Sequence, residues 1–262
     1  MDGSAVAWAP MYFRQLLNEV SSCASYLLGC GSQGRFAVVD PHADLVDEYL
    51  RLAEAAGPIV AVLETHVQAD HVSGLPELVS RTGATAYLPE GAGVGFPHVA
   101  LADGDEVPLG NVTLRALATP GHAAAHHAYL VTDHRRSDEP WMVLTGDALL
   151  VGDAGRPDLH ANGERSAADM ARLLHRSIAE RLLSLPDDLL LYPAHYGGSV
   201  CGRALSGTPA STIGFERRHN RALQAGSEDE FVAALLADLP PAPEEQGRIV
   251  AANRAGGVPA AR

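Results

Sequence analysis

One short run of metal-binding residue types limits what this chain can fold into more than any other feature. Residues 65–71 read Thr-His-Val-Gln-Ala-Asp-His and directly follow the apolar run Ile59–Leu63. A short, fully apolar run that begins after Gly57-Pro58 is typical of a strand buried on both faces. Imidazole and carboxylate side chains just past the end of such a strand indicate a metal site. We therefore expect the fold to bring further ligands to this strand end.

Three later segments place a ligand-type residue where a predicted strand ends or a loop begins. His122 and Asp147 each follow a glycine, and His195 follows Pro-Ala. A glycine beside a ligand lets the backbone approach closely. A single His is most often a structural or surface residue, but four such segments in one chain are hard to obtain by chance. His126 and His127, which follow the first of them, are expected to pack or to form hydrogen bonds.

Composition excludes several classes of protein. The formal net charge of −13 disfavours binding to a nucleic acid backbone, which requires a basic surface. No apolar run approaches the roughly 20 residues of a membrane helix, and the N-terminus lacks the pattern of a signal peptide, so we expect a cytoplasmic protein with no membrane partner. The three cysteines form no C-x-x-C pair and are expected to be reduced. The 12 histidines fit a metal site.

The apolar pattern predicts strands with helices interspersed. Its order favours two sheets covered by helices over a doubly wound sheet, in a single domain of residues 1–262 with a helical extension at about 205–256 packed on it. The predicted strands are 11–15, 25–28, 36–39, 59–63, 84–88, 129–132, 141–144 and 189–192, with short antiparallel strands between residues 101 and 117. The predicted helices are 42–56, 74–82, 166–184, 211–223, 228–236 and 244–253.

Together these motifs resemble the metallo-β-lactamase-fold superfamily. Residues 65–71 are similar to its T-H-x-H-x-D-H signature, with Gln68 in place of the second His. The segments that end at His122, Asp147 and His195 are similar to its later metal segments, in the same order. The resemblance covers about residues 11–200. It implies an α+β fold, a four-layer αββα sandwich with the metal cleft along one edge.

Within the superfamily, two motifs resemble the persulfide dioxygenases, which are close relatives of the hydroxyacylglutathione hydrolases. They are Thr-Gly-Asp-Ala-Leu-Leu at residues 145–150 and Gly-Arg-Pro-Asp at residues 155–158. The resemblance implies one Fe(2+) per chain, held by His66, His122 and Asp147. Two imidazoles and one carboxylate on one face of an iron ion leave positions open for substrate and O2.

The hydrolases instead hold two metal ions, and Zn(2+) is the alternative metal here. For them the resemblance implies further ligands at Gln68, Asp70, His71 and His195, with Asp147 as a bridge. A neutral amide is a far poorer ligand than imidazole, so Gln68 lowers the expectation of a two-metal site. In the one-iron relatives that position does not bind iron, and Gln68 is then expected to form hydrogen bonds beside the site. We expect Asp70, His71 and His195 either to form a partial second metal site or to orient the ligands of the first metal through hydrogen bonds.

Four residues are expected to bind substrate or to support the loops: Thr145, Arg156, Asp158 and Tyr196. Thr145 is expected to support the Asp147 loop through its hydroxyl group. Arg156 either pairs with Asp158 or contacts substrate carboxylates, for which its planar guanidinium is suited. Tyr196 either donates a hydrogen bond in the site or packs. Cys201 is expected to be a buried, inert thiol, with a sulfur-carrying role as the alternative.

The leading functional hypothesis is an iron-dependent dioxygenase that oxidises a low-molecular-weight thiol persulfide with O2 to sulfite and thiol. One alternative is a thioester hydrolase of the hydroxyacylglutathione hydrolase type, which uses a metal-bound hydroxide. Another is a catalytically silent member of the fold that binds a metabolite or a protein partner, for which Gln68 is the supporting feature. The resemblance also implies a homodimer or a homotetramer.

Overall fold

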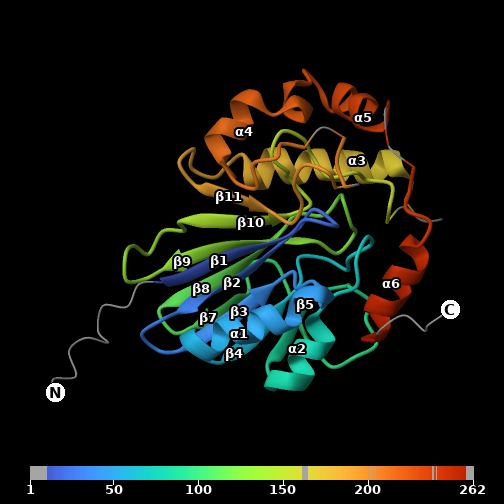
Figure 1. Cartoon of the computed structure of the whole chain (residues 1–262). Helices are drawn as coiled ribbons and strands as arrows, with labels where there is room; N and C mark the ends of the chain where they lie inside the picture. The colour runs from blue at the N-terminus through green and yellow to red at the C-terminus, as the bar shows by residue number, and fades with distance from the viewer. Residues whose placement is uncertain are drawn as a thin grey trace, which may run out of the picture.

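The computed structural model is a sandwich of two six-stranded sheets with helices on both outer faces (Figure 1). The structure describes residues 11–160, 165–199, 201–203, 205–237, 239 and 241–257. The limits of the predicted domain, residues 1 and 262, lie outside these ranges. The layers follow the order helix, sheet, sheet, helix, which is the four-layer αββα arrangement of an α+β fold. In the described part of the chain, no helix is both long and apolar enough to cross a bilayer.

The first sheet contains the strand that precedes the Thr65–His66 segment. Its strands follow chain order, and the first three are antiparallel while the rest are parallel. Because parallel neighbours need a crossover, helices α1 (Val46–Ala56) and α2 (Leu75–Thr82) lie between them in sequence and cover the outer face. The strands are β1 (Met11–Asn18), β2 (Cys23–Cys30), β3 (Arg35–Val39), β4 (Ile59–Leu63), β5 (Thr85–Pro89) and β6 (Val99–Leu101).

The second sheet supplies the remaining segments of the metal motif. Its order is β12-β11-β10-β9-β8-β7, and only β10 and β11 pair in parallel, because helix α3 (Ala167–Arg176) and a π-helical turn (Ser177–Leu182) lie between them. The strands are β7 (Glu106–Leu109), β8 (Val112–Ala118), β9 (His127–Asp133), β10 (Met142–Gly146), β11 (Leu190–Pro193) and β12 (Ser211–Thr212).

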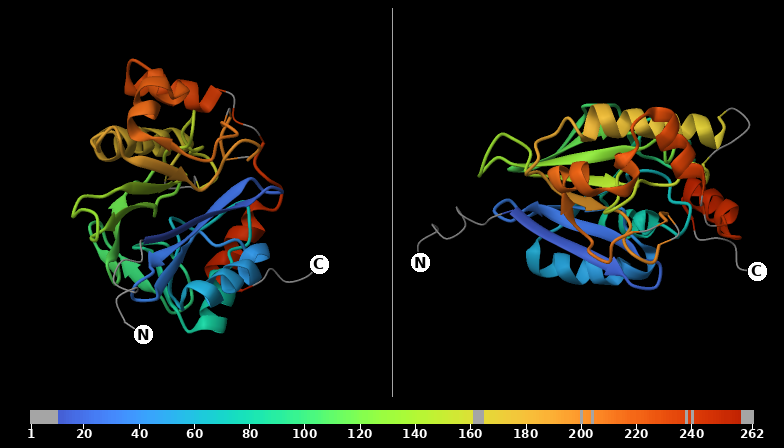
Figure 2. Two further views of the ribbon diagram at one scale, coloured as in Figure 1. Left: turned by 60° about the vertical axis from the view of Figure 1, so that its left-hand side comes forward. Right: turned by 90° about the horizontal axis from the view of Figure 1, so that it is seen from above.

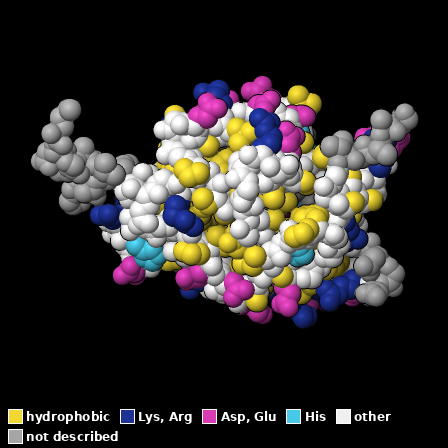
Figure 3. Space-filling view, turned by 90° about the horizontal axis from the view of Figure 1, so that it is seen from below, with side chains coloured by type: hydrophobic (Ala, Val, Ile, Leu, Met, Phe, Trp, Pro, Cys, Tyr) yellow, Lys and Arg dark blue, Asp and Glu magenta, His cyan; other side chains and the backbone are white. Residues whose placement is uncertain are grey.

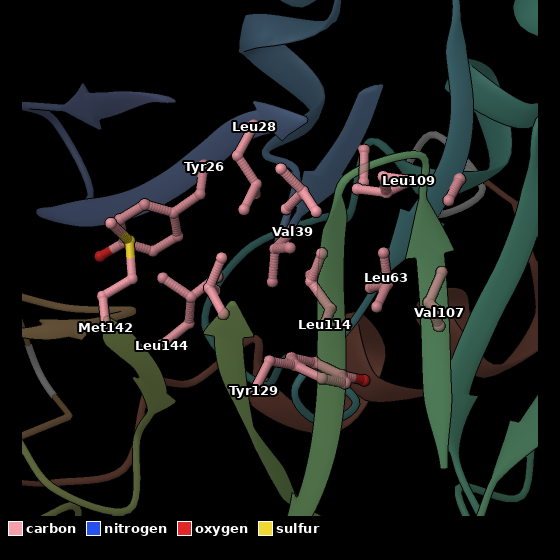
Figure 4. Close-up of a cluster of buried hydrophobic side chains, with 14 of the residues drawn as sticks. Tyr26, Leu28, Val39, Leu63, Val107, Leu109, Leu114, Tyr129, Met142 and Leu144 are labelled. Atoms are coloured by element: carbon pink, nitrogen blue, oxygen red, sulfur yellow. The ribbon is translucent and has the colours of Figure 1, made fainter. Parts of the chain in front are cut away.

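The main apolar core lies between the two sheets. Figure 4 shows Leu28, Val39 and Leu63 of the first sheet facing Leu114 and Leu144 of the second. These side chains are all buried, as expected of the inner faces of two packed sheets. A hydrogen bond also joins the layers, from the Tyr129 hydroxyl to the carbonyl oxygen of Glu64, at 2.8 Å. It ties the second sheet to the residue just before the metal motif.

Further helices cover the second sheet and one edge of the sandwich. Helix α5 (Glu228–Ala237) packs against α3, and α4 (Ile213–His219) lies beside them (Figure 2). Helix α6 (Gln246–Ala255) lies apart from that group, against the first sheet (Figures 1 and 2). On the face that Figure 3 shows, acidic and basic side chains are interspersed around the rim, so the negative net charge is not concentrated there.

Two predicted helices are wrong in part. Residues 211–223 do not form one helix: Ser211 and Thr212 pair with β11, and Asn220 interrupts the rest before a 3-10 turn (Arg221–Gln224). Asn220 adopts an extended conformation because its side-chain amide donates hydrogen bonds to the carbonyl oxygens of Leu150 and Asp153. The helix predicted over residues 166–184 begins at the Ser166 capping box but changes to a π-helix at Ser177.

Candidate metal centre

Three of the predicted ligands meet at one edge of the sandwich. His66 follows β4, His122 lies in the loop between β8 and β9, and Asp147 directly follows β10. Nε2 of His122 lies 3.5 Å and Nε2 of His66 lies 3.9 Å from Oδ2 of Asp147. The two imidazole rings are 4.8 Å apart between centroids. All three side chains are at most 1% exposed, so the site is shielded from solvent.

Hydrogen bonds orient both imidazoles with one nitrogen toward Asp147. Nδ1 of His122 donates to the carbonyl oxygen of Arg156 at 2.8 Å, which leaves Nε2 with a free lone pair. The Thr65 hydroxyl donates to Asp40 and therefore accepts from Nδ1 of His66, at 3.0 Å. Burial lowers the pKa of both imidazoles, so both are neutral at neutral pH, the form that binds metals.

Asp147 offers one oxygen to a metal and uses the other in a hydrogen bond. Oδ1 accepts from Nδ1 of His195 at 2.6 Å, whereas Oδ2 is buried and has no hydrogen-bond partner among the described residues. Burial opposes ionisation of Asp147, but the positive His195 outweighs it and lowers the pKa of the carboxyl. A buried carboxylate oxygen without a partner, facing two imidazole nitrogens, fits a divalent metal ion.

The loop that carries Asp147 is held by close backbone packing. Gly146 has a φ of +53°, and a Cβ there would lie 2.6 Å from Nε2 of His126. That nitrogen accepts a hydrogen bond from the Asp147 backbone at 3.1 Å. The Thr145 hydroxyl donates to the carbonyl oxygen of Leu149 at 2.7 Å. His126 is thus a buried hydrogen-bonding residue that positions the Asp147 backbone.

A second cluster of potential ligands lies beside the first. Nε2 of His195 contacts Oδ2 of Asp70 at 2.7 Å, so His195 bridges Asp70 and Asp147. Cys23, Asp70, His71 and His195 each offer one ligand atom, and these atoms all lie within 4.8 Å of one another. Burial opposes a charge on His195, but the two carboxylates outweigh it and raise the pKa of the imidazole well above its ordinary value. The protonated ring donates to both carboxylates.

Cys23 is a residue that the sequence did not point to. Its Sγ lies 3.3 Å from Nε2 of His195 and 3.5 Å from Nδ1 of His71. Burial opposes ionisation of this thiol, but the two imidazoles lower its pKa to about 7. Cys201 also lies at the cluster, with Sγ 3.7 Å from Oδ2 of Asp70, and burial raises its thiol pKa well above the ordinary value. A lone cysteine at the start of a strand carries no sequence signal for such a position.

Gln68 is engaged with two buried acids. Its Nε2 donates to Asp40 at 3.2 Å and to Glu64 at 3.3 Å, while its Oε1 is buried without a hydrogen-bond partner among the described residues. Burial raises the pKa of Asp40 to about 6 and that of Glu64 well above its ordinary value. Both carboxyl groups thus accept from the same amide nitrogen, and the amide oxygen is the atom of this side chain that could bind a metal.

The other predicted residues support loops in this structure. Arg156 is 1% exposed and pairs with Asp158 at 2.7 Å, and its own carbonyl oxygen holds His122. The Tyr196 hydroxyl donates to the carbonyl oxygen of Asn18 at 3.3 Å. The structure thus places both residues near the metal loops without bringing the Tyr196 hydroxyl to the His–His–Asp set.

His160 is a further histidine at the centre that the sequence did not indicate. One ring nitrogen of His160 lies within 4.8 Å of ligand nitrogens of both His66 and His122. Burial and the neighbouring His122 lower its pKa to about 3, so the ring is neutral. The only sequence signal is that His160 comes two residues after the Gly-Arg-Pro-Asp motif.

Comparisons with known proteins agree with this architecture. The family model of the metallo-beta-lactamase superfamily matches residues 18–195, and the chain belongs to this superfamily. The mitochondrial persulfide dioxygenase ETHE1 of Homo sapiens is 30% identical over 251 residues, covering 95% of this chain and 90% of the human protein. Hydroxyacylglutathione hydrolases are also among the relatives.

Two solved structures share the fold over nearly the whole chain. The crystal structure of ETHE1 from Myxococcus xanthus has a TM-score of 0.80 and 32% identity, and the match covers 94% of this chain and all of that one. A metallo-beta-lactamase structure from Staphylococcus aureus has a TM-score of 0.88 and 30% identity, covering 97% of this chain and 75% of that one. The relatives therefore include a persulfide dioxygenase that matches 95% of this chain.

Proposed function

We propose that this protein is an iron-dependent persulfide dioxygenase. The observation that carries the proposal is the set formed by His66, His122 and Asp147, in which two neutral imidazoles and one unpartnered carboxylate oxygen face one another. Two imidazoles and one carboxylate are the donor set of mononuclear non-haem iron oxygenases. The similarity to the persulfide dioxygenase ETHE1, over 95% of this chain, supports the same assignment.

The substrates would be O2 and the persulfide of a low-molecular-weight thiol. In the overall reaction, one persulfide, one O2 and one water give one thiol, one sulfite and two protons. The terminal sulfur loses its bond to the inner sulfur and gains three oxygens, two from O2 and one from water. Fe(2+), when bound, supplies the redox chemistry that O2 requires and leaves positions for a soft sulfur donor.

The residues of the chain orient and shield this site. Arg156 fixes His122 through its carbonyl oxygen, and Thr65 fixes His66. His195 occupies one oxygen of Asp147, so that only the other is available to iron. Such partners of the ligands set ligand orientation and typically contribute about 10–100-fold to metal affinity or activity. Burial of the whole set keeps bulk water from the reacting atoms.

A two-metal thioester hydrolase is the second candidate, and one specific observation favours it. Cys23, Asp70, His71 and His195 form a complete four-donor set beside the first site, so Zn(2+) has a second place to bind. Against it, Gln68 stands where the first metal of a hydrolase has its third imidazole, and a neutral amide is a far poorer ligand. We therefore rank the one-iron oxygenase first.

The experiment measures metal content and oxygen uptake in the same preparation. Protein loaded anaerobically with Fe(2+) should hold about one iron per chain, consume O2 with glutathione persulfide and release an equal amount of sulfite. The control is Asp147→Asn, which should lose iron and activity together. Iron-loaded protein that consumes no O2, or protein that holds about two zinc ions and hydrolyses a glutathione thioester, would refute the proposal.

A further inference from the structure

His160 lies beside the ligands of the metal site, and its ring forms no hydrogen bond or ion pair with another described residue. Its ring centroid is 5.6 Å from that of His122 and 6.0 Å from that of His66, and both contacts are edge-to-face. Its Nε2 is buried and makes no hydrogen bond to any described residue. Burial removes water from this nitrogen without replacing it, so its lone pair is free to bind an ion.

The spacing of the three imidazoles suits one ion. One nitrogen from each of His66, His122 and His160 lies within 4.8 Å of the other two. Nitrogens bound to the same metal at about 2.1 Å lie about 3.0 Å apart at 90° and about 3.4 Å apart at the tetrahedral angle. A pair of nitrogens at the limit of 4.8 Å would therefore need to approach by up to about 1.8 Å to share an ion, which rotations of the side chains can supply.

The main chain around His160 is held from two sides. Asp158, two residues before it, pairs with the buried guanidinium of Arg156. The carbonyl oxygen of Leu159 accepts a hydrogen bond from the side chain of Gln246 in helix α6. The position of His160 is therefore set by the same loop that fixes His122 and by the C-terminal helix.

We propose that His160 is a fourth protein ligand of the metal ion held by His66, His122 and Asp147. This inference rests on the metal site of the proposed function but does not depend on the reaction. One ring nitrogen of His160 lies near those of His66 and His122, and its Nε2 has no hydrogen-bond partner among the described residues. In an octahedral site, four protein ligands leave two positions, which is the number that one sulfur donor and one O2 molecule need. A fourth protein ligand thus leaves enough coordination positions for both substrates.

The test counts the protein ligands with Co(2+) as a spectroscopic probe in place of iron. The visible absorption of bound Co(2+) depends on the number and kind of its ligands, so His160→Gly should change the spectrum of the loaded protein. Added free imidazole should restore it, because the ring can enter the space that the substitution leaves. Competition with a chelator should show affinity lower by at least about tenfold, the loss that follows even from changing a partner of a ligand.

The matched control is His175→Gly, which removes an imidazole on α3 that lies against Phe231 and near Glu228. Its Co(2+) spectrum should equal that of the unaltered protein. A spectrum of His160→Gly that is unchanged, or that changes without recovery in imidazole, overturns the inference. Because the readout requires no persulfide, failure of the oxygen-uptake assay and failure of this test are separate results.

Discussion

The C-terminal helix α6 should stabilise the metal loop through a single side chain, Asn253. Its Nδ2 donates to the carbonyl oxygens of Gln68 and His71, at 3.0 and 2.9 Å, and its Oδ1 accepts from the backbone of Ser73 at 3.0 Å. Asn253 is 8% exposed, and it lies at least 180 residues from the loop in sequence. The perturbation is therefore Asn253→Ala, which removes three hydrogen bonds at once.

The expected loss follows from those contacts. A buried hydrogen bond contributes about 1 kcal/mol net, so the three together should lower the free energy of unfolding by about 3 kcal/mol. The loss is larger if water cannot reach the two carbonyl oxygens that remain, because each would stay unpaired. Arg248→Ala on the same helix is the control: this exposed side chain pairs with Glu245 on the surface, which contributes at most about 1 kcal/mol.

Urea denaturation of both variants measures the difference in stability, and hydrogen exchange localises it. Amides of residues 68–73 should exchange faster in Asn253→Ala than in the unaltered protein, whereas Arg248→Ala should leave them unchanged. Equal stability of the two variants, or unchanged protection of residues 68–73, would show that α6 does not hold the metal loop.

Three further predictions concern the backbone, the pH dependence and the ligands. Gly121→Ala should be severely destabilising, since φ is +142° and a Cβ would lie 2.3 Å from the α-carbon of Leu174 in α3. Gly83→Ala, where a Cβ would have no described atom within 4 Å, should lower the free energy of unfolding by only about 1 kcal/mol, and thermal melts compare the two variants. Burial and a neighbouring imidazole lower the pKa of His42 to about 4, so the unfolded chain takes up its proton first as the pH falls. Stability should therefore decline between about pH 6.5 and pH 4, and urea titrations should show a smaller decline in His42→Gln. Asp147→Asn should lose most of its bound iron while its far-UV circular dichroism stays unchanged; full iron occupancy in this variant would refute the assigned ligand set.

Much of the fold follows from local patterns in the sequence. The buried strand β4 is predicted by its continuous apolar run, and α3 by its apolar stripe and the Ser166 cap. These signals are local because backbone periodicity and capping involve residues only a few positions apart. The prediction of one helix over residues 211–223 is wrong at Asn220 because contacts distant in sequence decide the backbone there. Asn220 is not helical, and its side-chain amide donates to the carbonyl oxygens of Leu150 and Asp153.

The candidate site divides in the same way. Sequence motifs predicted His66, His122 and Asp147 as ligands, because ligand-type residues that follow predicted strands can be recognised from the sequence alone. They did not predict Cys23. This residue lies beside His195 because the backbone N–H of Ala24 donates to the carbonyl oxygen of Ala194, at 2.6 Å. Nor did they name His160, whose neighbours at the site are brought together by two different sheets.

The sequence by itself determined which residue types are available and at which strand ends they stand, because side-chain chemistry and hydrophobic periodicity are properties of short segments. Only the tertiary structure decided which atoms remain free to bind a metal. Asp147 keeps one oxygen free because His195 donates to the other, and the Gln68 side chain is oriented by Asp40 and Glu64, which accept from its amide nitrogen. Which atoms are free therefore depends on hydrogen bonds between residues that are far apart in the chain, and no local sequence pattern predicts these bonds.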